Sequence, residues 1–212
     1  LTKHLKSCAC SSSVSLFGPG VGESICLDLG NGDWFIIDSC LDPLAKRPAA
    51  LVYLEGLGLD PAVVVKGVVV SHWHDDHVKG MAEIVRTCDK AKVFVSVALQ
   101  NREFYQLIHI YNGRSSSRDR NPNTGVDELK SVFEILKRKI EMSNQEKNEM
   151  PLNFVGPDAR IYSDGEVEIF TLSPSNGSIL SAFDNFSDIL NEAKASPKII
   201  PRPSSNFCAV AL

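Results

Sequence analysis

Several features are scarce or absent in this sequence of 212 residues, and each absence excludes a class of protein. No apolar run approaches the roughly 20 residues that a membrane-spanning helix needs. Residues 1–13 contain two lysines but no apolar core, so they do not resemble a secretory signal. There is no excess of positive charge, because the net charge is −4. A surface that binds nucleic acid over its whole area is therefore excluded, although a local basic groove is not.

Cysteine is too sparse and too badly spaced to form a scaffold. Of the six cysteines only Cys8 and Cys10 are close together, and the C-x-C spacing is poor for a zinc knuckle. Most of the others lie in or beside apolar, strand-like runs. We therefore expect free, buried thiols in a reducing cytoplasm rather than metal ligands or bridges.

What the sequence does contain is the composition of a globular domain. Hydrophobic residues make up 43% and charged residues 23% of the chain, and no internal repeat is present. A chain of this length can bury a core without a structural metal. We expect residues 1–212 to form a single domain, and any bound metal to serve catalysis.

The first half of the chain alternates strands and helices. Strands are predicted at 14–18, 23–29 and 34–38, the last two joined by the hairpin turn Gly30-Asn31-Gly32-Asp33. The last of these strands ends on Asp38. A helix is predicted within 44–57, a buried β-branched strand at 63–70, a helix at 81–88 and a buried strand at 92–97. This alternation predicts an α/β fold.

The second half is richer in helix. Helices are predicted at 101–111, at 124–140 behind a capping box of Thr124 and Asp127, and at 178–194. The helical region at about 101–150 resembles an insertion. Strands are predicted around the turn at Asp164-Gly165, and a final strand at 207–212. Because a buried strand needs partners on both sides, we expect a protein partner or a further C-terminal segment to cover that open edge.

The residues with the clearest chemistry follow the buried strand 63–70. Ser71-His72-Trp73-His74-Asp75-Asp76-His77 holds three of the five histidines of the chain, with two aspartates among them. The carboxyl end of a strand is where α/β proteins gather ligands. His72 and His74, two residues apart, can point to one side of an extended segment, and the chain can then turn Asp76 and His77 toward a nearby point. Imidazole and carboxylate are suitable ligands for divalent metals.

His72, His74, Asp76 and His77 match the H-x-H-x-D-H signature of the metallo-β-lactamase superfamily, which the chain therefore resembles. Ile36-Ile37-Asp38 at a strand end is similar to the first motif of that family. Gly20 to Ser24 resembles the G-x-G-[DE]-S sequence of the branch related to the hydrolase domain of the DNA-uptake (competence) channel. The Leu172-Ser-Pro-Ser stretch and Asn206 before the last apolar run are similar to that branch too.

The resemblance implies a fold, a cofactor and residue roles. The fold is the αββα sandwich, of which this chain would be the N-terminal portion, incomplete at its C-terminal side. His72 and His74 would hold a first divalent metal, and Asp76 and His77 a second. Zinc is the expected metal and manganese the alternative. Asp76 would also accept a proton from the attacking water, and Asp38 would orient a histidine ring.

The sequence also departs from the family pattern. After His77 the only histidine is His109, which lies in a predicted helix and is expected to be structural. Neither Asn206 nor its neighbouring serines are good ligands, so the further ligands of the family would have to lie beyond Leu212. The chain thus offers about half of a site.

Several weaker signals bear on the substrate. Arg114, Arg118 and Arg120 lie in a Ser-rich loop, where they could contact a phosphate backbone or belong to a solvated face. Trp73 could line the substrate mouth or pack under the loop.

We therefore expect a metal-dependent hydrolase acting on a small-molecule or nucleic-acid phosphodiester, as a phosphodiesterase or nuclease. A small-molecule ester, lactone or thioester hydrolase is the alternative enzyme. A catalytically inactive binding or regulatory subunit with the same fold is the alternative of another class.

Overall fold

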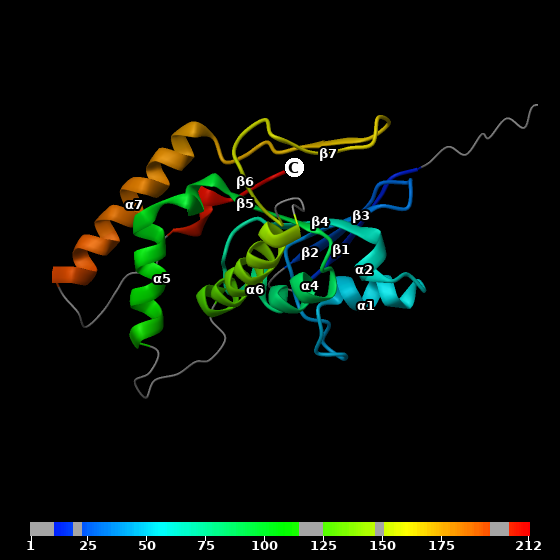
Figure 1. Cartoon of the computed structure of the whole chain (residues 1–212), viewed down its shortest axis with the longest axis horizontal. Helices are drawn as coiled ribbons and strands as arrows, with labels where there is room; N and C mark the ends of the chain where they lie inside the picture. The colour runs from blue at the N-terminus through cyan, green and yellow to red at the C-terminus, as the bar shows by residue number, and fades with distance from the viewer. Residues whose placement is uncertain (1–10, 19–22, 115–124, 147–150, 196–203) are drawn as a thin grey trace, which may run out of the picture.

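A six-stranded mixed β-sheet forms the centre of the protein, seen here in a computed structural model (Figure 1). The structure describes residues 11–18, 23–114, 125–146, 151–195 and 204–212. The strands follow one another across the sheet in chain order: β1 (Ser13–Phe17), β2 (Ser24–Asp28), β3 (Trp34–Ile37), β4 (Val65–Val70), β5 (Lys92–Ser96) and β6 (Leu152–Val155). A second, two-stranded sheet is made by β7 (Arg160–Ser163) and β8 (Glu168–Phe170). The mixed α/β architecture expected from the sequence is confirmed.

The direction of the strands changes at β3. β1, β2 and β3 are antiparallel, whereas β3, β4, β5 and β6 are parallel. Gly30 and Gly32 supply positive φ angles of 80° and 94° in the turn between β2 and β3, which confirms the predicted hairpin. Parallel neighbours bring the carboxyl ends of β3 and β4 to the same edge, where Asp38 and the histidine motif follow.

Most of the segments that connect the strands contain helices. Their bounds are α1 (Ala49–Gly56), α2 (Pro61–Val64), α3 (Asp75–Val78), α4 (Met81–Thr87), α5 (Arg102–Arg114), α6 (Gly125–Glu146) and α7 (Asn176–Ala195), with 3₁₀ turns η1 (Val97–Gln100) and η2 (Ser205–Cys208). The helix predicted within 44–57 begins only after Pro48, and Leu44 is 92% exposed. The strand predicted from Val63 begins at Val65, because Asp60 caps a short helix that opens on Pro61.

The two faces of the large sheet carry different cores. Alternate side chains point to opposite faces, so Ile36, Val68 and Val95 join the main core with the helices. Phe35 and Val69 point the other way, into a smaller core shared with Ile169 of β8 and Val210. In Figure 1 the β7–β8 hairpin accordingly lies across the sheet from α1, α4 and α6.

Helix α6 is fixed to α4 at both ends of the shorter helix. Glu128 accepts a hydrogen bond from the Ala82 amide at the start of α4 (2.8 Å). Lys139 donates to the carbonyl of Val85 (2.8 Å) and to that of Asp89 (3.0 Å) at its end. An acid at the amino end and a base at the carboxyl end complement the helix dipole. Burial lowers the pKa of Lys139. The predicted helices of this region are confirmed, while their status as an insertion stays a prediction.

Three details of the prediction are wrong. Residues 207–212 do not form a strand: η2 takes up Phe207 and Cys208, and 209–212 make separate hydrogen bonds, such as Val210 N–H to Ser71 O (3.0 Å) and Ala211 N–H to the Ser173 hydroxyl (2.8 Å). Strand β6 was not expected, because its four residues are too few for a clear alternation. Leu180 of α7, expected to face inward, is 63% exposed. Thr124, expected to cap α6, lies outside the described residues.

The expectation of free thiols holds for the four cysteines that the structure describes. Cys26, Cys40, Cys88 and Cys208 are free and buried. Burial raises the pKa of Cys26, Cys88 and Cys208 to about 12, so these thiols are packing groups rather than nucleophiles. In the part of the chain that the structure describes, no helix combines the length and apolar character that crossing a membrane requires.

Gly67 of β4 is expected to be intolerant of any side chain. A Cβ atom there would overlap the ring of Phe35, which is held between Phe94 (ring centroids 6.1 Å apart) and Tyr162 (5.5 Å). We expect Gly67→Ala to lower the free energy of unfolding by about 3 kcal/mol, measured by urea denaturation. Gly56→Ala in α1 is the control, because its Cβ meets nothing within 4 Å and should cost nothing. Equal stability of the two variants would contradict this packing.

Candidate metal centre

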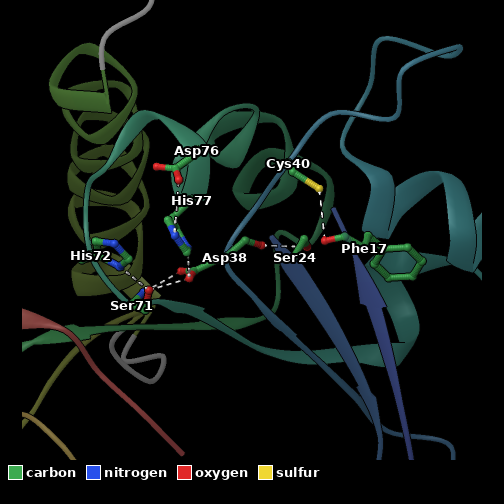
Figure 2. Close-up of polar contacts among 8 residues, drawn as sticks. All are labelled: Phe17, Ser24, Asp38, Cys40, Ser71, His72, Asp76 and His77. Atoms are coloured by element: carbon green, nitrogen blue, oxygen red, sulfur yellow. Dashed lines mark hydrogen bonds and ion pairs between the residues drawn. The ribbon is translucent and has the colours of Figure 1, made fainter. Parts of the chain in front are cut away.

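The histidine motif lies where β4 gives way to helix α3. Ser71 to His74 follow Val70 without regular secondary structure, and His74, the residue that precedes the helix, is extended, with φ −66° and ψ 145°. Asp76 and His77 are in the helix itself. The motif therefore presents two histidines from the segment before the helix and two further groups from the first turn of the helix. Figure 2 shows His72, Asp76 and His77 of this set.

Asp38 lies beside the motif, at the carboxyl end of β3. Its side chain is only 3% exposed, and its φ of 58° is in the left-handed region, which few residues other than glycine, asparagine and aspartate adopt readily. Its amide donates to Val69 O (2.9 Å) and its carbonyl accepts from the Ser24 hydroxyl (3.0 Å). This backbone position is thus held by both neighbouring strands, and the turned conformation aims the carboxylate at the motif.

The Asp38 carboxylate is fully engaged. Oδ1 accepts a hydrogen bond from the Ser71 amide (2.7 Å), and Oδ2 accepts one from the Ser71 hydroxyl. Oδ2 also lies 3.0 Å from Nδ1 of His77. Figure 2 shows the three groups converging on one carboxylate. A buried carboxylate needs such partners, because burying it without them costs several kcal/mol.

Each of two histidine rings uses Nδ1 within the protein. Nδ1 of His77 faces Asp38, and Nδ1 of His72 lies 2.7 Å from the Ser71 hydroxyl. The centroids of these two rings are 4.2 Å apart. Nε2 of His77 lies 3.7 Å from Oδ2 of Asp76. A histidine oriented through one nitrogen presents the other to a ligand, as metal-binding histidines do.

The surroundings shift the pKa values of His72 and His77 in opposite directions. Burial and then the neighbouring His77 lower the pKa of His72. The hydrogen bond with Asp38 raises the pKa of His77 above its ordinary value, against the effect of burial. The site therefore favours neutral His72, which is the form that can donate a lone pair to a metal.

Asp38, His72 and His77 form a group whose ligand-type atoms all lie within 4.8 Å of one another. Two imidazoles beside a carboxylate that bonds to one of them are a suitable arrangement for holding a divalent cation. His74 lies next to them, with its ring centroid 4.9 Å from that of His72. The structure thus places side by side the histidines singled out in the sequence, together with Asp38 and half-buried Asp76.

The two residues between the ligand candidates have structural contacts. Trp73 is buried and packs against Phe104 (ring centroids 5.0 Å apart) and Phe186 (6.1 Å). This packing favours the second of the two roles expected for Trp73, packing under the loop. Asp75 accepts a hydrogen bond from the amide of Gly125, at the start of α6.

Most of the remaining candidates have side chains that the structure does not describe. Arg118 and Arg120 are not described, and neither are the side chains of Arg114 and His109 in α5. Asn206 is exposed on η2. Sequence reasoning missed Ser71, which links Asp38 to His72. Its only signal was its position between the buried strand and the first histidine.

The neighbouring aspartates should separate a helix contact from a metal contact. We expect Asp75→Ala to lower the free energy of unfolding by about 1 kcal/mol, because α6 loses an acceptor at its amino end, and to leave metal content unchanged. Asp76→Ala should leave the free energy of unfolding unchanged and lose bound metal. Chemical denaturation and elemental analysis of both variants make the comparison. Loss of metal from Asp75→Ala alone would show that the two roles are assigned the wrong way round.

A hollow of about 670 Å³ opens beside these residues. Asp38, Ser71, His72 and His77 contribute to its lining. The rest of the wall is mainly apolar and comes from β1, β2, β3, β8 and the last residues: Val14, Ile25, Leu27, Ile37, Ile169, Phe170, Ala209, Val210, Ala211 and Leu212, with Glu23 and Glu168 as further charged members.

The family model of the metallo-beta-lactamase superfamily matches residues 18–127, which is more than half of the 212-residue chain. The chain therefore belongs to this superfamily. Its members are mostly metal-dependent hydrolases, and some are inactive. No curated protein matches the chain.

Several solved metallo-beta-lactamase structures match parts of the chain. A mutant metallo-beta-lactamase from Cronobacter sakazakii is 28% identical, with 43% of this chain and 35% of that chain covered and a TM-score of 0.34. A metallo-beta-lactamase from Staphylococcus aureus is 14% identical, with 76% and 34% covered and a TM-score of 0.41. A subclass B3 metallo-beta-lactamase from a soil metagenome library is 16% identical, with 76% and 49% covered and a TM-score of 0.43. The chain thus spans half or less of the length of these structures.

Proposed function

We propose that the chain carries part of the metal centre of a hydrolase, with one or two divalent cations held by His72, His74, Asp76 and His77. Zinc is the proposed metal and manganese the alternative. The observation that carries the proposal is the bond between Asp38 and Nδ1 of His77, since a carboxylate behind a histidine is how proteins orient a ligating ring. Asp38 is assigned to orientation rather than ligation, because both of its oxygens already accept hydrogen bonds.

A divalent cation bound there would supply Lewis-acid chemistry. It would lower the pKa of water, so that the water could lose a proton and attack near neutral pH. The carboxylate of Asp76 would accept a proton from the attacking water. The water oxygen would bond to the carbonyl carbon or phosphorus, and the bond to the leaving oxygen, or to the leaving sulfur of a thioester, would break. The same proton would then pass from Asp76 to that leaving atom.

Two substrate classes are proposed. A phosphodiester in a nucleotide or nucleic acid follows from the resemblance of Gly20 to Ser24 to the DNA-uptake branch. The arginines that favoured this class lie in or beside the undescribed loop. A small-molecule ester, lactone or thioester is the second candidate, and the apolar lining of the hollow beside His72 and His77 favours it.

The proposal extends to the setting of the protein. Residues 1–212 would form one domain with a helical insertion at about 101–150. The free, buried thiols favour a reducing compartment such as the cytoplasm. A protein partner is proposed to lie against residues 209–212.

The test is hydrolysis by zinc-loaded protein of p-nitrophenyl acetate and bis(p-nitrophenyl) phosphate. Asp76→Asn is the matched variant, because it keeps the shape of the side chain and removes the proton acceptor. We expect turnover of at least one substrate, reduced at least 100-fold in Asp76→Asn. Zinc-loaded protein that hydrolyses neither substrate would favour the inactive binding or regulatory subunit.

A further inference from the structure

Ser71 lies between Asp38 and His72, and its hydroxyl bonds to both of them (Figure 2). The backbone of Ser71 is held on both sides: its amide donates to Oδ1 of Asp38 (2.7 Å), and its carbonyl accepts from the Val210 amide (3.0 Å). The residue is 8% exposed, so water has little access to the hydroxyl. The position and the partners of this hydroxyl are therefore set by the fold.

A single proton decides the direction of these two hydrogen bonds. A serine hydroxyl has one proton to donate, and an ionised carboxylate can only accept. The Ser71 hydroxyl therefore donates to Oδ2 of Asp38. The same oxygen has no proton left for His72, so it must accept one from Nδ1 of that ring, which lies 2.7 Å away. His72 thus carries its proton on Nδ1, and Nε2 of the neutral ring keeps a lone pair.

Asp38 reaches the second histidine without an intermediary. Nδ1 of His77 lies 3.0 Å from the same Oδ2, so His77 also carries a proton on Nδ1. One carboxylate oxygen therefore determines the protonated nitrogen of two neighbouring rings, directly for His77 and through a neutral hydroxyl for His72. Which nitrogen of a histidine binds metal is set by the hydrogen bond that the other nitrogen makes.

We propose that Ser71 is a positioning residue of the metal centre: it transmits the acceptor Asp38 to His72, and so selects Nε2 of His72 as the atom that binds metal. The inference rests on the proposed function and adds to it a residue outside the H-x-H-x-D-H signature. Without the hydroxyl, Nδ1 of His72 would lose this acceptor, and either nitrogen of the ring could then carry the proton.

Asp38→Asn should reverse the direction of both hydrogen bonds. The amide oxygen of asparagine stays opposite the Ser71 amide, and its nitrogen takes the place of Oδ2. That nitrogen donates to the Ser71 hydroxyl, which then donates to Nδ1 of His72. We expect the proton of His72 to move from Nδ1 in the parent to Nε2 in Asp38→Asn. The measurement is nitrogen NMR of the histidine rings in zinc-free protein, at mildly alkaline pH, where the rings are neutral. His72 protonated on Nδ1 in both proteins would overturn the inference.

Removing the hydroxyl separates the effect of Ser71 from that of Asp38. In Ser71→Ala we expect His72 to lose its preference for Nδ1, while His77, which bonds to Asp38 directly, keeps it. Adding Asp38→Asn to Ser71→Ala should leave His72 as it is in Ser71→Ala alone, because Asp38 acts on that ring through the hydroxyl. A ring of His72 that still responds to Asp38→Asn in the absence of the hydroxyl would refute the transmission.

Zinc affinity measures the consequence for metal binding. We expect Ser71→Ala to weaken zinc binding at least tenfold, and Ser71→Thr, which keeps a hydroxyl, to bind zinc like the parent. Ser96→Ala is the matched control, because it removes another buried serine hydroxyl, which accepts from the Ala98 amide (3.2 Å) at the end of β5. Parent-like zinc affinity in Ser71→Ala, or an equal loss in Ser96→Ala, would contradict the role of Ser71.

Failure of this inference can be told from failure of the proposed function, because the protonated nitrogens are identified without metal. A parent that binds zinc but carries the proton of His72 on Nε2 in the zinc-free state would overturn only the role of Ser71. A parent that never binds zinc would overturn the proposed function, and with it the assignment of His72 as a ligand.

Discussion

Replacing Asp38 with asparagine should weaken metal binding about 10- to 100-fold while leaving the protein folded. Asparagine tolerates the left-handed φ of 58° at this position, so the backbone strain that alanine would add is avoided. The amide oxygen can still accept from the Ser71 amide. What is lost is the negative charge behind Nδ1 of His77, and with it the group that fixes that ring.

The measurement is a competitive zinc titration against a chromophoric chelator. Asp60→Asn is the control, because Asp60 caps α2 away from the site and asparagine caps a helix equally well. We expect its zinc affinity and stability to match the parent. Unchanged zinc affinity in Asp38→Asn would show that Asp38 does not orient the ligand.

Trp73→Ala should cost more stability than any other substitution within the motif, about 3–5 kcal/mol. The indole is buried among Phe104 and Phe186, so truncation leaves a cavity between α5, α7 and the loop. The free energy of unfolding from urea denaturation measures the effect. Phe207→Ala is the control and should cost little, because Phe207 is 41% exposed.

Trp73→Phe tests the same packing more gently, since a smaller aromatic ring keeps part of the contact with Phe104. We expect an intermediate loss of stability, and zinc binding like that of the parent in the folded protein. Parent-like stability of Trp73→Ala, together with altered substrate preference, would instead place the indole at the mouth of the site.

Local patterns explain why the strands near the site were predictable. Gly30 to Asp33 encodes a hairpin within four residues, and Val63 to Val70 is β-branched along almost its whole length. The order of these elements then determines that Asp38 and the motif follow adjacent parallel strands. The proximity of Asp38 to His77 was therefore open to inference from sequence.

The individual hydrogen bonds that join distant segments could not be predicted from the sequence. The bond from Gly125 to Asp75 spans fifty residues and depends on how α6 docks. No periodicity in the sequence encodes it. The hydrogen bond from Ser71 to Asp38 depends on the left-handed backbone conformation of Asp38, which no residue pattern predicted. Residues 207–212 are apolar enough for a strand, but η2 takes up the first two of them and separate bonds hold the rest.

The central claim is that the histidine motif holds metal, and elemental analysis of the purified protein tests it most directly. The parent is compared with a His72→Ala, His74→Ala double variant, after both are supplied with zinc and desalted. We expect one or two equivalents of zinc or manganese in the parent and less than a tenth of that in the variant, with matching circular dichroism spectra. A folded parent that stays empty when metal is supplied, or a variant that retains the same content, would contradict the account.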